Sequence, residues 1–170
     1  MQRPARGYAN RSAERGSALF EYALALALLF TFMFGIMDFS RALYAYHWAS
    51  YAAHDATRWA SLRGSSCRTF GSACPAAAVD VTNYVKGIVS GGITVAACNA
   101  QNNNPGCLVV TTTWPGATGN PTGCDTSRGT NSPGCPVNVQ VQYRYGFTLP
   151  FVSRVASISM LSTSRLTISQ

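Results

Sequence analysis

The pattern of apolar positions near the start of the chain predicts one membrane-spanning helix. From Ser17 to Met37 the only charged side chain is Glu21. At about 1.5 Å per residue this stretch reaches roughly 30 Å, the thickness of a bilayer's hydrocarbon core. No proline interrupts the chain from Ser17 to Arg63, and Gly35 is the only glycine there. We therefore expect a single long helix over 17–63, with the transmembrane span 17–37 as its first part.

Beyond the span, the same helix carries two stripes with helical periodicity. One stripe is smooth and would allow another element to approach closely; it consists of Ala42, Ala45, Ala49, Ala52, Ala56 and Ala60. The other is bulky and consists of Tyr44, Trp48, Tyr51, Trp59 and Leu62. The bulky stripe can pack on the chain's own domain, pack on other subunits or, around Tyr44, form an interfacial aromatic belt.

Residues 64–170 are predicted to form a small α+β domain. Alternation of apolar and polar residues predicts a strand at Val137–Leu149 with one buried face. A second strand, Ser157–Ile168, is expected to bury its even positions, Ile158, Met160, Leu166 and Ile168. Shorter strands are predicted at Ile93–Ala97 and Leu108–Trp114, and a helix at Pro75–Val89. The fold class is α+β, a long N-terminal helix packed on a small antiparallel sheet.

Charge and cysteine placement predict the topology. The net charge is +7, but Arg3, Arg6, Arg11 and Arg15 crowd the N-terminal segment, as basic residues do on the cytoplasmic side of a span. We expect a cytoplasmic N-terminus, an extracytoplasmic C-terminal domain and no nucleic-acid partner. All six cysteines follow the span, which suits an oxidising compartment and disulfides: Cys67, Cys74, Cys98, Cys107, Cys124 and Cys135. Pairing of sequence neighbours is the simplest of the 15 connectivities that six cysteines allow.

The junction between the basic segment and the span carries a recognisable motif. The residues Arg15-Gly16-Ser17-Ala18-Leu19-Phe20-Glu21-Tyr22 resemble the recognition sequence of type IV prepilins of the tight-adherence (Flp) class. The resemblance implies that a membrane-embedded prepilin peptidase cuts between Gly16 and Ser17. It would remove a leader, 1–16, and place Glu21 and Tyr22 at positions used for subunit pairing and recognition. An ordinary cleaved signal peptide, or an uncleaved anchor with Glu21 among the lipid headgroups, are the alternatives.

The next part of the chain extends the likeness. The segments Gly35-Ile36-Met37-Asp38-Phe39-Ser40-Arg41 and Ala52-Ala53-His54-Asp55-Ala56-Thr57-Arg58 resemble the N-terminal region of TadE-like proteins, and the likeness covers about 16–64. It implies a pilin-like minor pilin or pseudopilin of the bacterial inner membrane. Membrane lipid, other pilin subunits and the pilus assembly platform would be its partners. The helix interface would use Asp38, Phe39, Arg41, Asp55 and Arg58, and Asp38 can pair with Arg41.

Residues 115–136 are rich in Gly, Pro, Asn, Thr and Ser and are expected to form an exposed loop, pinned by Cys124 and Cys135. This loop could contact a surface or host ligand, which would make the chain an adhesin. A permanently anchored interaction module that never enters a filament is the other alternative. We expect no enzyme, because phosphate-binding, G-x-S-x-G and H-E-x-x-H motifs are absent from the sequence. We expect neither a cofactor nor a metal.

Overall fold

The computed structural model describes residues 11–68, 73–118, 123–148 and 157–169. The chain divides into two compact units, residues 1–39 and 40–170. Helix α1 (Arg11–Ser61) supplies all the described residues of the first unit and also the first helix of the second. It therefore begins earlier than the predicted start at Ser17 and ends two residues before Arg63.

The part of α1 in the first unit has the properties of a membrane span. Within the described residues, α1 is the one helix long and apolar enough to cross a membrane, and none of its most apolar window is buried in the protein. Large side chains such as Leu19, Phe20 and Phe32 are more than two thirds exposed, at 73%, 72% and 71%. Such a surface is costly in water and favourable in lipid.

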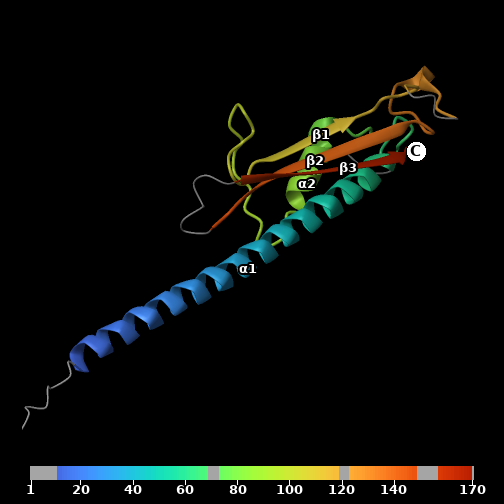
Figure 1. Cartoon of the computed structure of the whole chain (residues 1–170). Helices are drawn as coiled ribbons and strands as arrows, with labels where there is room; N and C mark the ends of the chain where they lie inside the picture. Colours follow the sequence, from blue (N-terminus) through green and yellow to red (C-terminus); the bar gives the residue numbers. More distant parts are fainter. Residues whose placement is uncertain (1–10, 69–72, 119–122, 149–156, 170) are drawn as a thin grey trace, which may run out of the picture. The chain divides into compact units, whose positions relative to one another are not determined.

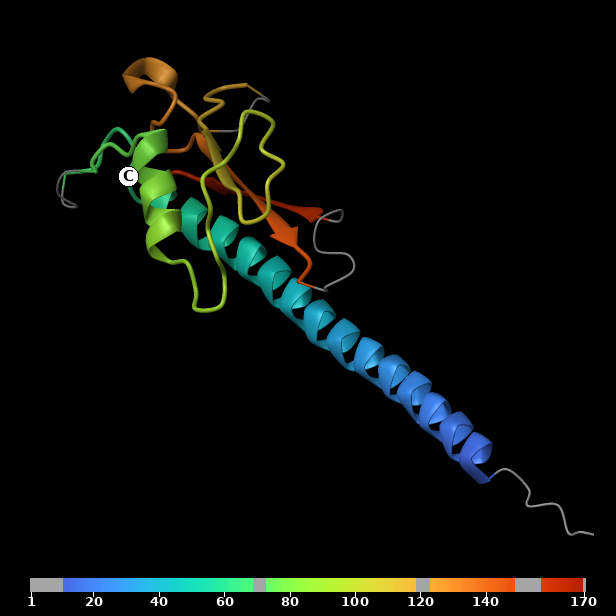
Figure 2. The same cartoon turned by 90° about the vertical axis from the view of Figure 1, so that its left-hand side faces the viewer.

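The second unit packs the end of α1 against an antiparallel sheet of three strands, in the order β1-β2-β3 (Figure 1). Helix α2 lies beside the last turns of α1 (Figure 2), where the rings of Trp59 and Tyr84 stack with centroids 5.0 Å apart. The α+β arrangement predicted from the sequence is confirmed. Its elements are α2 (Ala78–Gly87), β1 (Leu108–Thr113), the 3₁₀ turn η1 (Thr126–Arg128), β2 (Pro136–Gly146) and β3 (Ser157–Thr167).

The core lies between the smooth stripe of α1 and the odd positions of β2. Ala52, Ala56, Val137, Val139 and Val141 have no exposed surface. Alanine has the smallest side chain that still favours a helix, so it lets the helix backbone approach the valines closely. The smooth stripe, expected to allow another element to approach closely, is buried at every one of its positions from residue 45 onward.

The bulky stripe is divided between core and surface. Trp48 is 5% exposed, and its ring meets that of Tyr143 edge-on at 5.8 Å. Tyr44 and Tyr51, by contrast, are 46% and 62% exposed. Packing on the chain's own domain therefore accounts for Trp48 and for the partly buried Trp59. Tyr44 meets the domain through its hydroxyl, which is hydrogen-bonded to that of Ser90, and Tyr51 lies on the surface.

One predicted strand is absent, and the predicted burial along another is only partly confirmed. Residues 93–97 form no strand; they contribute one isolated bridge, between Ala96 and Cys107, with Ala96 N–H donating to Gly106 C=O at 2.9 Å. The disulfide from Cys98 to Cys107 closes the loop that follows this segment. Met160 and Ile168 are buried as expected, but Ile158 and Leu166 are 47% and 42% exposed, because the core beneath β3 is narrower than its eleven residues.

The remaining differences concern the ends of elements. The helix expected over Pro75–Val89 is shorter, and β1 stops one residue before Trp114. Strand β2 ends at Gly146, where a Cβ atom would lie 2.6 Å from Cβ of Pro105. Only glycine allows the loop before β1 to approach so closely. Leu149, the expected last residue of the strand, lies outside the described residues.

The six cysteines form three disulfides between sequence neighbours. The pairs are Cys67–Cys74, Cys98–Cys107 and Cys124–Cys135. Each closes a short loop next to a strand or at the end of α1. In a domain with so small a core, such crosslinks typically contribute about 2–4 kcal/mol each.

Candidate functional site

From Gly16 onward, the residues of the predicted processing motif lie on the exposed surface of α1. Gly16, Ser17 and Glu21 are exposed, and Tyr22 is 72% exposed. Ser17 and Glu21 are four residues apart, so they lie one above the other on the same side of the helix. A Cβ atom at position 16 would meet no atom within 4 Å. Packing within the chain therefore gives no reason for glycine there, although glycine costs an exposed helix interior about 1 kcal/mol relative to alanine.

Three predicted interface residues follow the span. Asp38 is only 3% exposed, whereas Phe39 is 63% exposed and Arg41 is exposed. The Nη1 of Arg41 donates a hydrogen bond to Oγ1 of Thr148 at 3.3 Å, which ties α1 to the segment that follows β2. Pairing between Asp38 and Arg41 stays a prediction.

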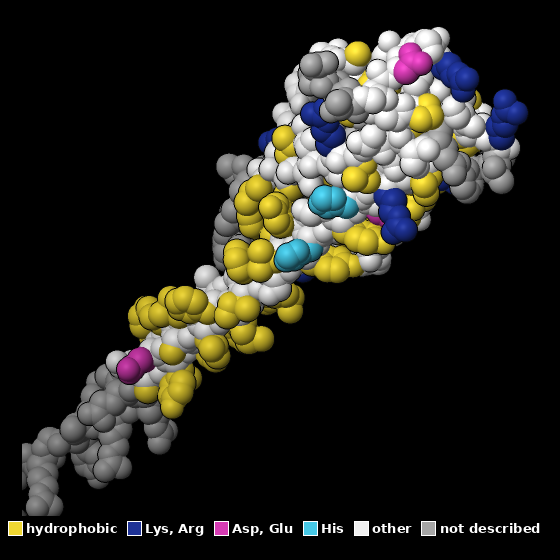
Figure 3. Space-filling model, turned by 90° about the vertical axis from the view of Figure 1, so that its right-hand side faces the viewer, with side chains coloured by type: hydrophobic (Ala, Val, Ile, Leu, Met, Phe, Trp, Pro, Cys, Tyr) yellow, Lys and Arg dark blue, Asp and Glu magenta, His cyan; other side chains and the backbone are white. Residues whose placement is uncertain are grey.

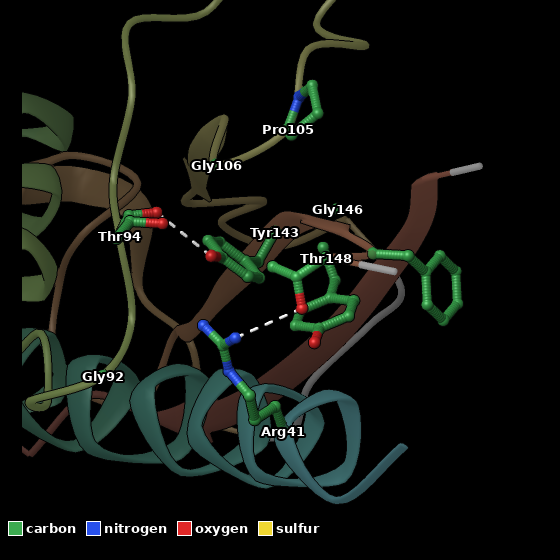
Figure 4. A pocket seen from close by; sticks show the side chains of 10 residues that line it. Arg41, Gly92, Thr94, Pro105, Gly106, Tyr143, Gly146 and Thr148 are labelled. Carbon is green, nitrogen blue, oxygen red and sulfur yellow. Dashed lines mark hydrogen bonds between the residues drawn. The ribbon is translucent and has the colours of Figure 1, made fainter. Parts of the chain in front are cut away.

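Arg41 also lines a pocket of about 240 Å³ in the second unit (Figure 4). The guanidinium points toward the ring of Tyr143, whose hydroxyl donates to the carbonyl oxygen of Thr94 at 3.1 Å. Burial raises the pKa of Tyr143, so this hydroxyl is held as a neutral donor. Glycines and Pro105 form much of the remaining wall. The pocket brings together one cation and neutral hydrogen-bonding groups, which suits the joining of α1 to the sheet rather than catalysis.

The other two predicted interface residues, Asp55 and Arg58, point to different surroundings. Oδ2 of Asp55 accepts a hydrogen bond from the hydroxyl of Tyr84 at 2.7 Å, so Asp55 anchors α2 within its own chain. Trp59 stacks on Tyr84, and the guanidinium of Arg63 lies 4.1 Å from the centre of the Trp59 ring. Arg58 is exposed and remains available to a neighbour. The sequence analysis missed this cluster, although Tyr84 lies on the apolar face of the predicted helix.

Burial, together with the hydrogen bond to Asp55 and the charge of Asp55, raises the pKa of Tyr84 to about 12. Because the folded pKa exceeds the ordinary value of 10, neutral Tyr84 contributes its full stability below pH 10. This contribution is lost as the pH rises from 10 to about 12. We expect ultraviolet titration of the full chain in detergent to show a late tyrosine that Tyr84→Phe removes and Asp55→Asn moves to lower pH. Because the pKa of Tyr143 is also raised, the two titrations are compared with each other, and an unchanged late absorbance step in Tyr84→Phe would refute the assignment.

The predicted loop 115–136 is fastened at both ends, and its residues 119–122 lie outside the described residues. Cys135 is fully buried and joined to Cys124, and Gly134 N–H donates to Ile168 C=O at 2.8 Å. Asp125 accepts hydrogen bonds from the backbone N–H and the hydroxyl of Ser127, both at 2.9 Å, and these bonds lower its pKa. These contacts hold the loop's base. Recognition of a surface by the loop stays a prediction.

The described residues contain no group of three or more His, Cys, Asp or Glu side chains that could hold a metal ion. Figure 3 shows one face of the molecule, on which hydrophobic side chains gather along the helix and few charged ones interrupt them. Among the described elements, a chemically distinctive surface is therefore the apolar span 17–37 with its single carboxylate, Glu21.

Comparison with known families supports the resemblance found in the sequence. A family model described as "TadE-like protein" matches residues 16–58. The match begins at Gly16 and includes Glu21, Asp38 and Arg58, and it suggests a protein associated with a tight-adherence pilus. No curated protein and no solved structure matches the chain. The family match ends within α1, so it does not extend to α2 or to the sheet.

Proposed function

We propose that the chain is a minor pilin or pseudopilin that takes part in assembling a tight-adherence (type IVc) pilus. In this proposal a prepilin peptidase cuts between Gly16 and Ser17. The span 17–37 then holds the chain in the bacterial inner membrane, with the C-terminal domain outside the cytoplasm. The observation that carries the proposal is an exposed carboxylate, Glu21, one helical turn after Ser17 on an otherwise apolar span.

The proposed role of Glu21 follows from the cost of burying a charge in hydrocarbon. A carboxylate within a membrane helix needs a compensating positive group. Cleavage after Gly16 would create such a group, the α-amine of Ser17, on the same side of the helix. When helices of several subunits lie side by side, the amine of one chain can neutralise Glu21 of its neighbour. Processing and assembly would in this way be linked by a single ion pair.

The second unit would supply the contacts that distinguish this chain from a pilin that is little more than a helix. Its outward groups on α1 include Tyr44, Tyr51 and Arg58, which are accessible to neighbouring subunits or to the assembly platform. Asp55 is already engaged with Tyr84. We therefore assign lateral contacts to the exposed aromatic side chains and to Arg58.

Mechanical shearing of cells tests whether the chain enters the filament. We expect antibody against the C-terminal domain to detect the chain in the sheared pilus fraction, in an amount small relative to the major pilin. A strain without the prepilin peptidase should retain all of it in the membrane. Equal retention in both strains would favour the alternative, a permanently anchored interaction module. An adhesin role for loop 115–136 predicts that deleting the loop between Cys124 and Cys135 abolishes attachment and leaves pili intact.

A further inference from the structure

Strand β3 forms a long open edge of the sheet. All eleven of its residues, Ser157–Thr167, pair with β2. Among the described residues, no strand pairs with its other side. An unpaired strand presents a row of backbone N–H and C=O groups that another strand can complete.

The opposite edge of the sheet is protected. Strand β1 has only six residues, and α2 packs against it. Directly before β1, Cys107 pairs with Ala96 in an isolated bridge. A short, covered edge is a common means of preventing strand addition. The protein uses this means for β1, whereas β3 is nearly twice as long and no described strand bonds to its outer side.

Hydrogen bonds define which residues of β3 face the open side. Ile168 donates to Cys135 C=O and accepts from Gly134 N–H, both at 2.8 Å, so even-numbered residues point their backbone groups toward β2. Ser169 N–H points the other way and donates to Ser61 C=O at 3.0 Å. By alternation, and leaving out the strand's first residue, the open edge consists of the backbone groups of Ser159, Leu161, Thr163, Arg165 and Thr167.

The side chains of this edge also favour a protein partner. Leu161 is 54% exposed, and Ile158 and Leu166 are 47% and 42% exposed. Proline and lysine, which often block edge strands, are absent from the sequence of β3. Arg165 is its one charged residue and is exposed.

We propose that β3 is a docking edge to which an extended segment of a different protein adds as a fourth strand. Only a polypeptide in the β conformation offers donors and acceptors at the spacing of the five outward-facing residues, so a lipid cannot fill this edge. The segment carries an acidic side chain opposite Arg165 and an apolar one beside Leu161.

A second copy of the chain is a poor occupant because of its charge. Its own β3 contains no Asp or Glu, so it offers no acidic side chain to meet Arg165. Pairing of two copies through β3 would instead bring a second arginine to the same edge.

Site-specific photo-crosslinking in cells that make the whole pilus apparatus tests the proposal. The probe is p-benzoylphenylalanine placed in turn at Leu161, Thr163 and Arg165 of the full chain. We expect adducts with one other protein, and mass spectrometry should show the contacted residue moving by two positions at each step. Adducts within the same chain, adducts to a second copy, or no adduct at all would overturn the proposal.

Two variants and a control sharpen the test, with the probe kept at Arg165. Thr163→Pro removes an outward N–H and leaves the ladder to β2 intact, and Leu161→Lys adds a charge to the edge. Each should lower the adduct yield roughly tenfold or more, while Val79→Lys, an equally exposed position on α2, should not. Unchanged yields in both edge variants would contradict strand addition. If the mature chain begins at Ser17 but gives no adducts, the docking edge is refuted and the proposed processing is not. If a chain that keeps its leader gives adducts, the processing is refuted and the docking edge is not.

Discussion

Replacement of Glu21 by alanine is expected to abolish incorporation of the chain into pili. In the assembled helices the alanine would leave the Ser17 amine of a neighbour buried without a counter-charge. Breaking a buried ion pair on one side costs about 3–5 kcal/mol, which corresponds to a loss of roughly 100-fold or more in each subunit contact. The measurement is the amount of chain in the sheared pilus fraction, relative to the membrane fraction.

A matched control is available on the same helix. Thr31 is also a polar residue in the span, but its hydroxyl donates to the carbonyl oxygen of Ala27 at 2.8 Å and is therefore satisfied within its own helix. Thr31→Ala should assemble as the native chain does, and Glu21→Asp should retain part of the activity. Normal assembly of Glu21→Ala would show that the carboxylate has no pairing role.

Replacement of Ala56 by leucine is expected to cause a large loss of folding stability in the second unit. Ala56 has no exposed surface and lies in the stripe of α1 that packs on β2. Three additional carbon atoms would force the helix away from the valines, at a cost of about 1–3 kcal/mol or more. Urea denaturation of the full chain in detergent, followed by near-ultraviolet circular dichroism, should show a midpoint lower by roughly 1 M.

The same change at an exposed alanine provides the comparison. Ala78, at the first position of α2, is exposed, so Ala78→Leu should change the free energy of unfolding by less than about 0.5 kcal/mol. If Ala56→Leu were tolerated equally well, the close approach of α1 to the sheet would be incorrect.

Periodicity made much of the fold predictable. The alanine stripe repeats every three or four residues and β2 alternates strictly, and each pattern is produced by one buried face of a regular element. Position 158 of β3 shows the limit of this reasoning. The alternation identifies which side of the strand faces α1, but it does not tell how far the core extends beneath an edge strand.

Other features depend on contacts between distant residues. The hydrogen bond from Tyr84 to Asp55 joins residues 29 positions apart, and that from Arg41 to Thr148 joins residues 107 apart. Neither pair has a local sequence signal. The failed strand at residues 93–97 has the same origin, because a strand exists only where a partner strand lies beside it. Gly16 and Glu21, in contrast, were identified from the sequence because their proposed roles depend on local spacing along one helix.

The identity of the first residue of the mature chain tests the central claim most directly. The full chain would be purified from membranes of cells that contain the prepilin peptidase, and its N-terminus determined by mass spectrometry. The account predicts Ser17 as the first residue, bearing a free amine. A chain that still begins at Met1, or one cut at a position after the span, would contradict it.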